Sequence, residues 1–87
     1  MNDYPIIRKA TINDLDQIFN IERKAFHKDH WSLKMVSIEL NNEKDRTTWI
    51  IDKSKHIIAY CMVRGLKDEI NIINMAVKPS MQGKGYG

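Results

Sequence analysis

Three apolar, β-branched runs between residues 47 and 77 constrain the fold of this chain more than any other feature. Residues 49–51, 56–63 and 70–77 are separated by short stretches that contain the segments 52–55 and 65–68. These two segments are polar or contain glycine, which is typical of turns. Connections this short join antiparallel neighbours, because a parallel pair needs a crossover of about a dozen residues or more. The sequence therefore predicts a three-stranded antiparallel meander.

The residues before the meander predict one strand and two helices. Residues 4–9 are a short extended candidate, and Pro5 lacks an amide donor, which fits the beginning of a strand or a sheet edge better than a central strand. Thr11 and Asp14 match a capping box and start a helix over 12–26. Its apolar stripe contains Ile12, Leu15, Ile18, Phe19, Ala25 and Phe26.

Residues 27–30 interrupt the helical pattern and predict a loop. Ser32 is a good N-cap for a second helix over 33–42, and its buried stripe would contain Leu33, Val36 and Leu40. We expect both helices to pack on one face of the sheet, because each has a single apolar stripe. The predicted fold class is therefore α+β.

Composition narrows the class of protein further. The chain has 87 residues, of which 43% are hydrophobic and 29% charged, and this balance is typical of one globular domain rather than a disordered chain. No apolar run approaches the ~20 residues of a membrane span, and the start lacks a signal-peptide pattern. We therefore expect a cytoplasmic protein with no membrane partner.

The charge distribution and the potential metal ligands bear on nucleic acid and metal ions as partners. The net charge of +3 is spread along the chain, which does not favour a nucleic-acid partner. The single cysteine, Cys61, lies in an apolar run, so we expect a core side chain rather than a reactive thiol. His27, Asp29 and His30 are close in sequence, but a metal site needs more ligands, and we expect no metal.

The end of the chain carries a glycine-rich segment after the last predicted strand. Pro79 stops that strand at Val77 or Lys78, and glycines then alternate in the segment 82–87. Such glycines let the backbone turn sharply and present bare amides to a phosphate. Neither the P-loop spacing nor the Rossmann glycine spacing is met. Taken alone, the segment is as consistent with a flexible turn as with a phosphate site.

In context, this region resembles the acyl-coenzyme A motif of the GNAT superfamily of N-acetyltransferases. That motif follows a strand and reads Gln/Arg-x-x-Gly-x-Gly/Ala, here Gln82-x-x-Gly85-x-Gly87. The predicted order of a strand, two helices and a meander is similar to the family's opening. The ribosomal-protein alanine N-acetyltransferase (RimI) branch looks similar at Ile21-Glu22, Trp31-Ser32 and the segment 74–79. The resemblance implies an α/β sandwich type of α+β fold, with 1–87 as one incomplete domain that ends at the pyrophosphate loop.

The resemblance also implies acetyl-CoA as the co-substrate and assigns residues to it. Backbone groups of the last strand would bind the pantetheine arm and the acetyl carbonyl, and that strand would splay there. The glycine segment would hold the pyrophosphate, with Lys84 adding charge unless it is simply a solvated lysine. The implied cofactor residues are Met75, Ala76, Val77, Gln82, Gly83, Lys84, Gly85, Tyr86 and Gly87.

On the acceptor side, the resemblance places the loop between the two helices in the acceptor channel. Phe26, His27 and Trp31 would then lie near the incoming amine, although packing at the helix ends explains Phe26 and Trp31 equally well. Glu22 stands in an apolar stripe, where a carboxylate must be hydrogen-bonded or paired. It is either a locally bonded carboxylate or a wall of the substrate site.

The implied activity is acetyl transfer from acetyl-CoA to a protein N-terminal amine, such as the N-terminal alanine of a ribosomal protein. In that branch the general base and the general acid lie in a C-terminal part that residues 1–87 do not contain, so no catalytic residue is assigned. We expect little or no activity from the 87 residues alone. The alternative is a non-catalytic module that binds a partner, or a second copy as a homodimer, through the open edge of the strand 68–77.

Overall fold

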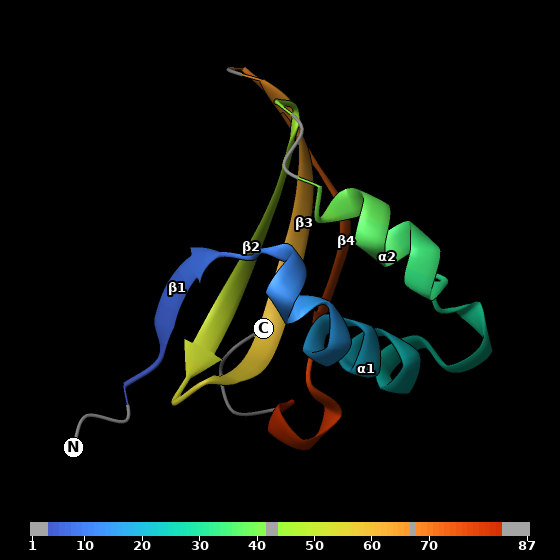
Figure 1. The fold of residues 1–87 in the computed structure, drawn as a ribbon, viewed down its shortest axis with the longest axis vertical. Helices are drawn as coiled ribbons and strands as arrows, with labels where there is room; N and C mark the ends of the chain where they lie inside the picture. Colours follow the sequence, from blue (N-terminus) through green and yellow to red (C-terminus); the bar gives the residue numbers. More distant parts are fainter. Residues whose placement is uncertain (1–3, 42–43, 67, 83–87) are drawn as a thin grey trace.

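The computed structural model describes residues 4–41, 44–66 and 68–82 (Figure 1). Within these ranges, four strands and two α-helices follow each other. They are β1 (Ile6–Lys9), α1 (Leu15–Phe26), α2 (Leu33–Glu39), β2 (Arg46–Lys53), β3 (His56–Leu66) and β4 (Glu69–Val77). Short 3-10 turns lie at Ile12–Asp14, His27–Asp29 and Pro79–Met81. None of the helices in the described residues has the length and apolar character needed to cross a bilayer.

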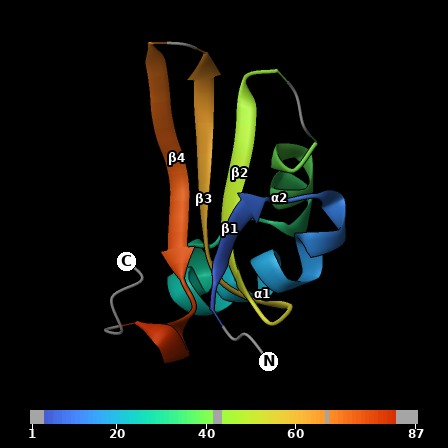
Figure 2. The ribbon, with the colours of Figure 1, turned by 90° about the vertical axis from the view of Figure 1, so that its left-hand side faces the viewer.

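The four strands form one antiparallel sheet in the order β1-β2-β3-β4. Both helices lie on one side of this sheet in Figure 1, and Figure 2 looks onto the side that carries no helix. The predicted meander, the edge position of the first strand and the packing of both helices on one face are confirmed. The α+β fold class is confirmed with them.

The helix boundaries differ from the prediction at three places. The capping box forms, with the Thr11 amide donating to Asp14 Oδ2 at 2.8 Å, but residues 12–14 are a 3-10 turn and α1 begins at Leu15. Ile12, expected in the apolar stripe, therefore lies before the α-helix and is 49% exposed. The loop expected at 27–30 contains a 3-10 turn.

The second helix is shorter than predicted. Ser32 caps it as expected, accepting a hydrogen bond from the Met35 amide at 3.1 Å, but the helix ends at Glu39 rather than at residue 42. A helix of seven residues turns little surface towards the sheet. Val36 and Leu40 are buried as predicted, whereas Leu33 is 47% exposed, and its assignment to the buried stripe was wrong.

One hydrophobic core lies between the helices and the sheet. Side chains at helical spacing on α1 and α2 meet alternate residues of β2, β3 and β4, which is the pattern expected when helices cover one sheet face. The buried members are Ala10, Ile18, Ile21, Val36, Leu40, Ile50, Ile57, Tyr60, Met62 and Ala76. Leu15, Phe19, Ala25 and Phe26 of the predicted stripe pack against this cluster as partly buried side chains.

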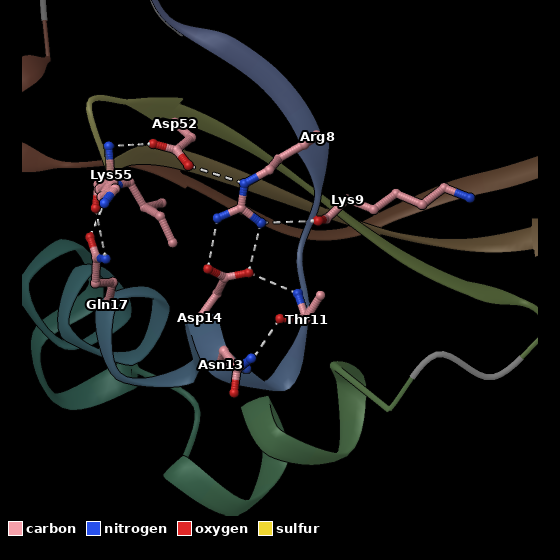
Figure 3. Close-up of polar contacts among 9 residues, drawn as sticks. Arg8, Lys9, Thr11, Asn13, Asp14, Gln17, Asp52 and Lys55 are labelled. Atoms are coloured by element: carbon pink, nitrogen blue, oxygen red, sulfur yellow. Dashed lines mark hydrogen bonds and ion pairs between the residues drawn. The ribbon is translucent and has the colours of Figure 1, made fainter.

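Arg8 on β1 joins the start of α1 to the end of β2 (Figure 3). Its guanidinium donates to both oxygens of Asp14 at 2.9 and 3.0 Å and to Asp52 Oδ2 at 3.0 Å. The Asp14 side chain is only 10% exposed, so one partly buried cation serves two carboxylates. This fork fixes the edge strand and the first turn of the helix relative to the sheet.

The β3–β4 ladder contains an irregularity that changes which face of the sheet the side chains of β4 occupy. Val63 pairs with Ile72 and Met62 pairs with Asn74, so Ile73 is an extra residue on β4. One extra residue is a β-bulge, and it changes which face the following side chains meet. As a result Asn74 and Ala76 share the face of the helices, while Met75 lies opposite Cys61 on the helix-free face.

β2 carries a buried hydroxyl group on Thr48. Thr48 is 4% exposed, and its Oγ1 has no hydrogen-bond partner among the described residues. Thr48→Val replaces this hydroxyl by a methyl group of similar size, so we expect a gain of about 1 kcal/mol in the free energy of unfolding. Urea denaturation measures this change in unfolding free energy. Thr47→Val, at the half-buried neighbouring position, is the control. A loss of stability in Thr48→Val alone would mean that the hydroxyl is bonded in solution.

Candidate functional site

The end of β4 presents backbone groups to an open edge. The Lys78 amide donates to the Ile58 carbonyl at 2.6 Å, so these two residues form a hydrogen-bonded pair of the ladder. Hydrogen-bonded and non-hydrogen-bonded pairs alternate in an antiparallel ladder. The N–H and C=O groups of Met75 and Val77 therefore point away from β3, while those of Ala76 point towards it. In the described residues no strand pairs with this outer edge of β4.

The segment after β4 folds back on the strand. Pro79–Met81 form a 3-10 turn, and the Gln82 side chain donates from Nε2 to the Val77 carbonyl at 3.1 Å. Gln82 thereby fixes the exit from β4, where the motif begins. Gly83, Lys84, Gly85, Tyr86 and Gly87, the predicted pyrophosphate residues, lie outside the described residues. β4 stays paired with β3 up to Val77, and the irregularity of this ladder lies at Ile73. The splaying expected of β4 at Met75–Val77 stays a prediction.

Glu22 on α1 is buried, and its carboxylate accepts hydrogen bonds from three donors. It is 1% exposed, and its carboxylate accepts hydrogen bonds from the Trp31 amide at 2.8 Å and from Asn74 Nδ2 at 2.7 Å. The Tyr60 hydroxyl donates to the same carboxylate. Burial, followed by the hydrogen bond to Glu22 and the charge of Glu22, raises the pKa of Tyr60 well above its ordinary value, so this hydroxyl remains a donor. The structure thus places Glu22 as a locally bonded carboxylate.

The other predicted acceptor residues lie around the turn that joins α1 to α2. Phe26 and Trp31 are partly buried and pack against the core cluster. His27 is exposed and adopts a φ of 51° at the end of α1. The turn thus contains a non-glycine residue in the left-handed region, a conformation that costs about 1 kcal/mol or more and needs support from its surroundings.

Two hollows flank β4 on opposite faces of the sheet. On the helix side, a groove of about 260 Å³ is lined by Trp31, Met35, Ile38, Glu39, Arg64 and Ile73. On the helix-free side, an apolar groove of about 190 Å³ is lined by residues of all four strands, including Ile7, Trp49, Cys61, Met75 and Val77. The predicted cofactor strand therefore borders a hollow on each face of the sheet.

Cys61 lies in the helix-free groove and is half-buried, so it is not the core side chain that the sequence predicts. The alternation along β3 directs it away from the helices, because its neighbours Tyr60 and Met62 both face the core. Burial raises the pKa of its thiol, which disfavours a reactive thiolate. Within the described ranges no three His, Cys, Asp or Glu side chains come together as a metal site.

Sequence reasoning missed the two side chains that complete the Glu22 site, Tyr60 and Asn74. Tyr60 lies in an apolar run and Asn74 in a motif, and neither pattern indicates a contact with Glu22. One signal was present in β4, where Ile72 and Ile73 break the alternation of the strand. Such a break indicates a bulge, and a bulge would have placed the polar Asn74 on the face of Glu22.

Comparisons with known proteins agree with this geometry. The model of the acetyltransferase (GNAT) family matches residues 13–87. A Bacillus subtilis (strain 168) protein named "Putative ribosomal protein bS18-alanine N-acetyltransferase" is 27% identical over 81 residues, which are 93% of this chain and 53% of that protein.

Two solved structures share the fold. The ribosomal-protein-S18-alanine N-acetyltransferase of Escherichia coli superposes with a TM-score of 0.81 at 22% identity, over 94% of this chain and 51% of that one. The PaiA N-acetyltransferase of Thermoplasma acidophilum, in complex with coenzyme A, gives 0.71 at 15% identity, over 93% and 63%. The chain thus spans about half the length of its ribosomal-protein-alanine relatives. Because the family model covers residues 13–87, this chain belongs to the acetyltransferase (GNAT) family.

Proposed function

We propose that this chain forms the acetyl-CoA-binding part of an N-acetyltransferase that acts on a protein N-terminal amine. The observation that carries the proposal is the open edge of β4 before the glycine segment. There the backbone groups of Met75 and Val77 point away from β3, and among them the Val77 carbonyl accepts from Gln82. Backbone donors and acceptors on a strand edge suit an extended amide-containing chain such as the pantetheine arm of coenzyme A. A ribosomal-protein N-terminal alanine is the proposed acceptor, supported by the names of two relatives.

We propose further that residues 1–87 alone transfer acetyl groups slowly or not at all. Attack of an amine on a thioester needs a base for the proton, donors for the developing oxyanion and an acid for the leaving thiolate. The outward amides of β4 are suited to the second task. Glu22, a buried carboxylate that contacts Asn74 of this strand, already accepts three hydrogen bonds and is 1% exposed. It is therefore poorly placed to take a proton from an incoming amine.

Titration of the 87-residue chain with acetyl-CoA, followed by backbone amide chemical shifts and calorimetry, tests the proposal. We expect shifts at Met75 and Val77 and along the glycine segment. Met75→Pro removes the outward amide, which an edge strand tolerates, and should weaken binding about tenfold because one hydrogen bond is lost. Met75→Ala keeps that amide and should stay within about twofold of the wild type. Absence of any shift at saturating acetyl-CoA would contradict the proposal.

A second candidate function is self-association through the same edge. Ile70 and Ile72 on β4 are 62% and 60% exposed, and an apolar strand with an unpaired edge is a template for pairing with another chain. Because acetyl-CoA and a second copy would use the same backbone groups of Met75 and Val77, the two should compete. Sedimentation at two protein concentrations, with and without acetyl-CoA, separates them. Association that acetyl-CoA does not reverse favours the interaction module.

A further inference from the structure

Glu22 connects three elements that are distant in sequence. Its carboxylate accepts from the backbone amide of Trp31, from the hydroxyl of Tyr60 on β3 and from the amide of Asn74 on β4. All three donors are uncharged, and no ion pair involves Glu22 in the part of the chain that the structure describes. A buried carboxylate is tolerated only when its oxygens are well hydrogen-bonded, so these donors hold it and it holds them.

The donor on β4 depends on the bulge at Ile73. Without the extra residue, the period of two would carry Asn74 to the helix-free face, where Glu22 cannot be reached. With it, Asn74 faces Glu22 and the next residue, Met75, presents its backbone to the open edge. A contact of Glu22 therefore fixes the residue that directly precedes the proposed acetyl-CoA strand segment.

The donor at Trp31 lies at the other end of the proposed site. Residues 27–31 leave α1 through His27, which has a φ of 51°, and reach the N-cap of α2 at Ser32. Trp31 also lines the groove of about 260 Å³ on the helix side, which Ile73 lines from β4. The hydrogen bond to Glu22 holds the backbone at the end of this turn to the interior, and the Trp31 side chain also packs against the core cluster.

From these contacts we infer that Glu22 is a positioning residue that couples the α1–α2 turn to the Asn74–Val77 segment of β4. The inference rests on the proposed function for its meaning, since these are the segments that would line the acceptor channel and bind the acyl group. The carboxylate touches neither ligand. It acts through Trp31 and Asn74, so that a displacement of one segment is transmitted to the other.

The first test is a double-mutant cycle of Glu22 and Asn74 in the chain without ligand. The backbone amide of Trp31 is the group that is observed. Asn74→Ala should move the chemical shift of this amide, although the two residues share only Glu22. Glu22→Gln keeps the side-chain volume but replaces one accepting oxygen by an NH2 group, which cannot accept a hydrogen bond. We expect hydrogen exchange at the Trp31 amide to become roughly tenfold faster. In the Glu22→Gln background, Asn74→Ala should leave Trp31 unchanged. An equal effect of Asn74→Ala in both backgrounds would overturn the inference.

A matched control separates coupling from a general loss of stability. Glu39 on α2 is another buried carboxylate, 2% exposed, but it accepts from Arg64 at 2.6 Å and not from β4. Glu39→Gln should therefore leave the response of Trp31 to Asn74→Ala intact. If Glu22→Gln does not fold, Tyr60→Phe removes a different donor from the same carboxylate, and the response of Trp31 to Asn74→Ala should persist. If the response of Trp31 to Asn74→Ala disappeared in the Glu39→Gln background, the inference would be overturned.

A second arm with acetyl-CoA distinguishes this inference from the proposed function. In the wild type, acetyl-CoA should shift Met75, Val77 and, through Glu22, the amide of Trp31. In Glu22→Gln the shifts at Met75 and Val77 should remain while that of Trp31 is lost. Shifts at Met75 and Val77 without one at Trp31 in the wild type would contradict the inference alone. No shift anywhere would contradict the proposed function, and the ligand-free cycle would then decide the inference.

Discussion

Replacing Gly65 by alanine is expected to lower the free energy of unfolding by about 3 kcal/mol. Gly65 has a φ of +131°, which L side chains rarely adopt, and a Cβ at this position would lie 1.6 Å from the carbonyl oxygen of Glu69. The clash is with backbone, so no side-chain rotation relieves it. The end of the β3–β4 hairpin would have to open or shift, which disturbs the ladder that carries β4.

Thermal unfolding followed by circular dichroism measures this effect. For a chain of 87 residues, a loss of about 3 kcal/mol should lower Tm by more than roughly 10 °C. Leu66→Ala is the matched control, because this neighbour is 58% exposed and its change adds no atoms. We expect Leu66→Ala to stay within about 0.5 kcal/mol of the wild type. A Gly65→Ala variant as stable as this control would show that the hairpin adopts another backbone in solution.

Replacing Asp14 by asparagine is expected to cost about 2 kcal/mol at neutral pH. The carboxylate accepts two hydrogen bonds from Arg8, at 2.9 and 3.0 Å, and one from the Thr11 amide at 2.8 Å (Figure 3). The substitution removes the charge from the fork and weakens the capping box at the start of α1. Arg8 keeps Asp52 as a partner, which limits the loss. Asp29→Asn, at an exposed position, is the control and should change stability little.

The same carboxylate predicts a pH dependence with a definite sign. The hydrogen bond from Arg8 is the largest of the interactions that lower the pKa of Asp14 below its ordinary value of 3.8, against the opposing effect of burial. A carboxyl with a lowered pKa in the folded state contributes stability above its unfolded pKa, and that contribution is lost as the pH falls through the folded value. The difference between the wild type and Asp14→Asn should therefore be full at pH 6 and shrink below about pH 4.

Urea denaturation of both proteins between pH 7 and pH 2 tests this sign. The two curves of unfolding free energy against pH should converge towards acid, with the wild type falling more steeply. Parallel curves would mean that the Arg8–Asp14 fork does not form in solution, and the stability of the α1 start would then come from the capping box alone.

Much of the fold could be predicted from the sequence because its signals are local. Thr11 and Asp14 start the helical region, Ser32 starts α2, and short polar segments join the strands of the meander. Each of these features depends on residues within four positions of one another. The errors were local too. Ile12 and Leu33 are apolar residues at helix starts, where the chain has not yet turned its stripe onto the sheet.

The candidate site was predictable only in part. The motif around Gln82 and the strand segment Met75–Val77 were found from their order along the chain, and the outward direction of the Met75 and Val77 backbone groups needed the pairing of Lys78 with Ile58. The surroundings of Glu22 could not be derived in the same way. Its partners Tyr60 and Asn74 are 38 and 52 residues away, so no spacing rule connects them.

The local elements and their order follow from the amino-acid sequence, since capping, helical stripes and strand alternation each arise from near neighbours. Which residues meet across the sheet depends on the register of strands that are distant in sequence. A single extra residue at Ile73 turns Asn74 to the helices and leaves Met75 on the opposite face. Because strand side chains alternate with a period of two, one residue of register is enough to exchange a half-buried hydrogen-bond donor for an exposed side chain.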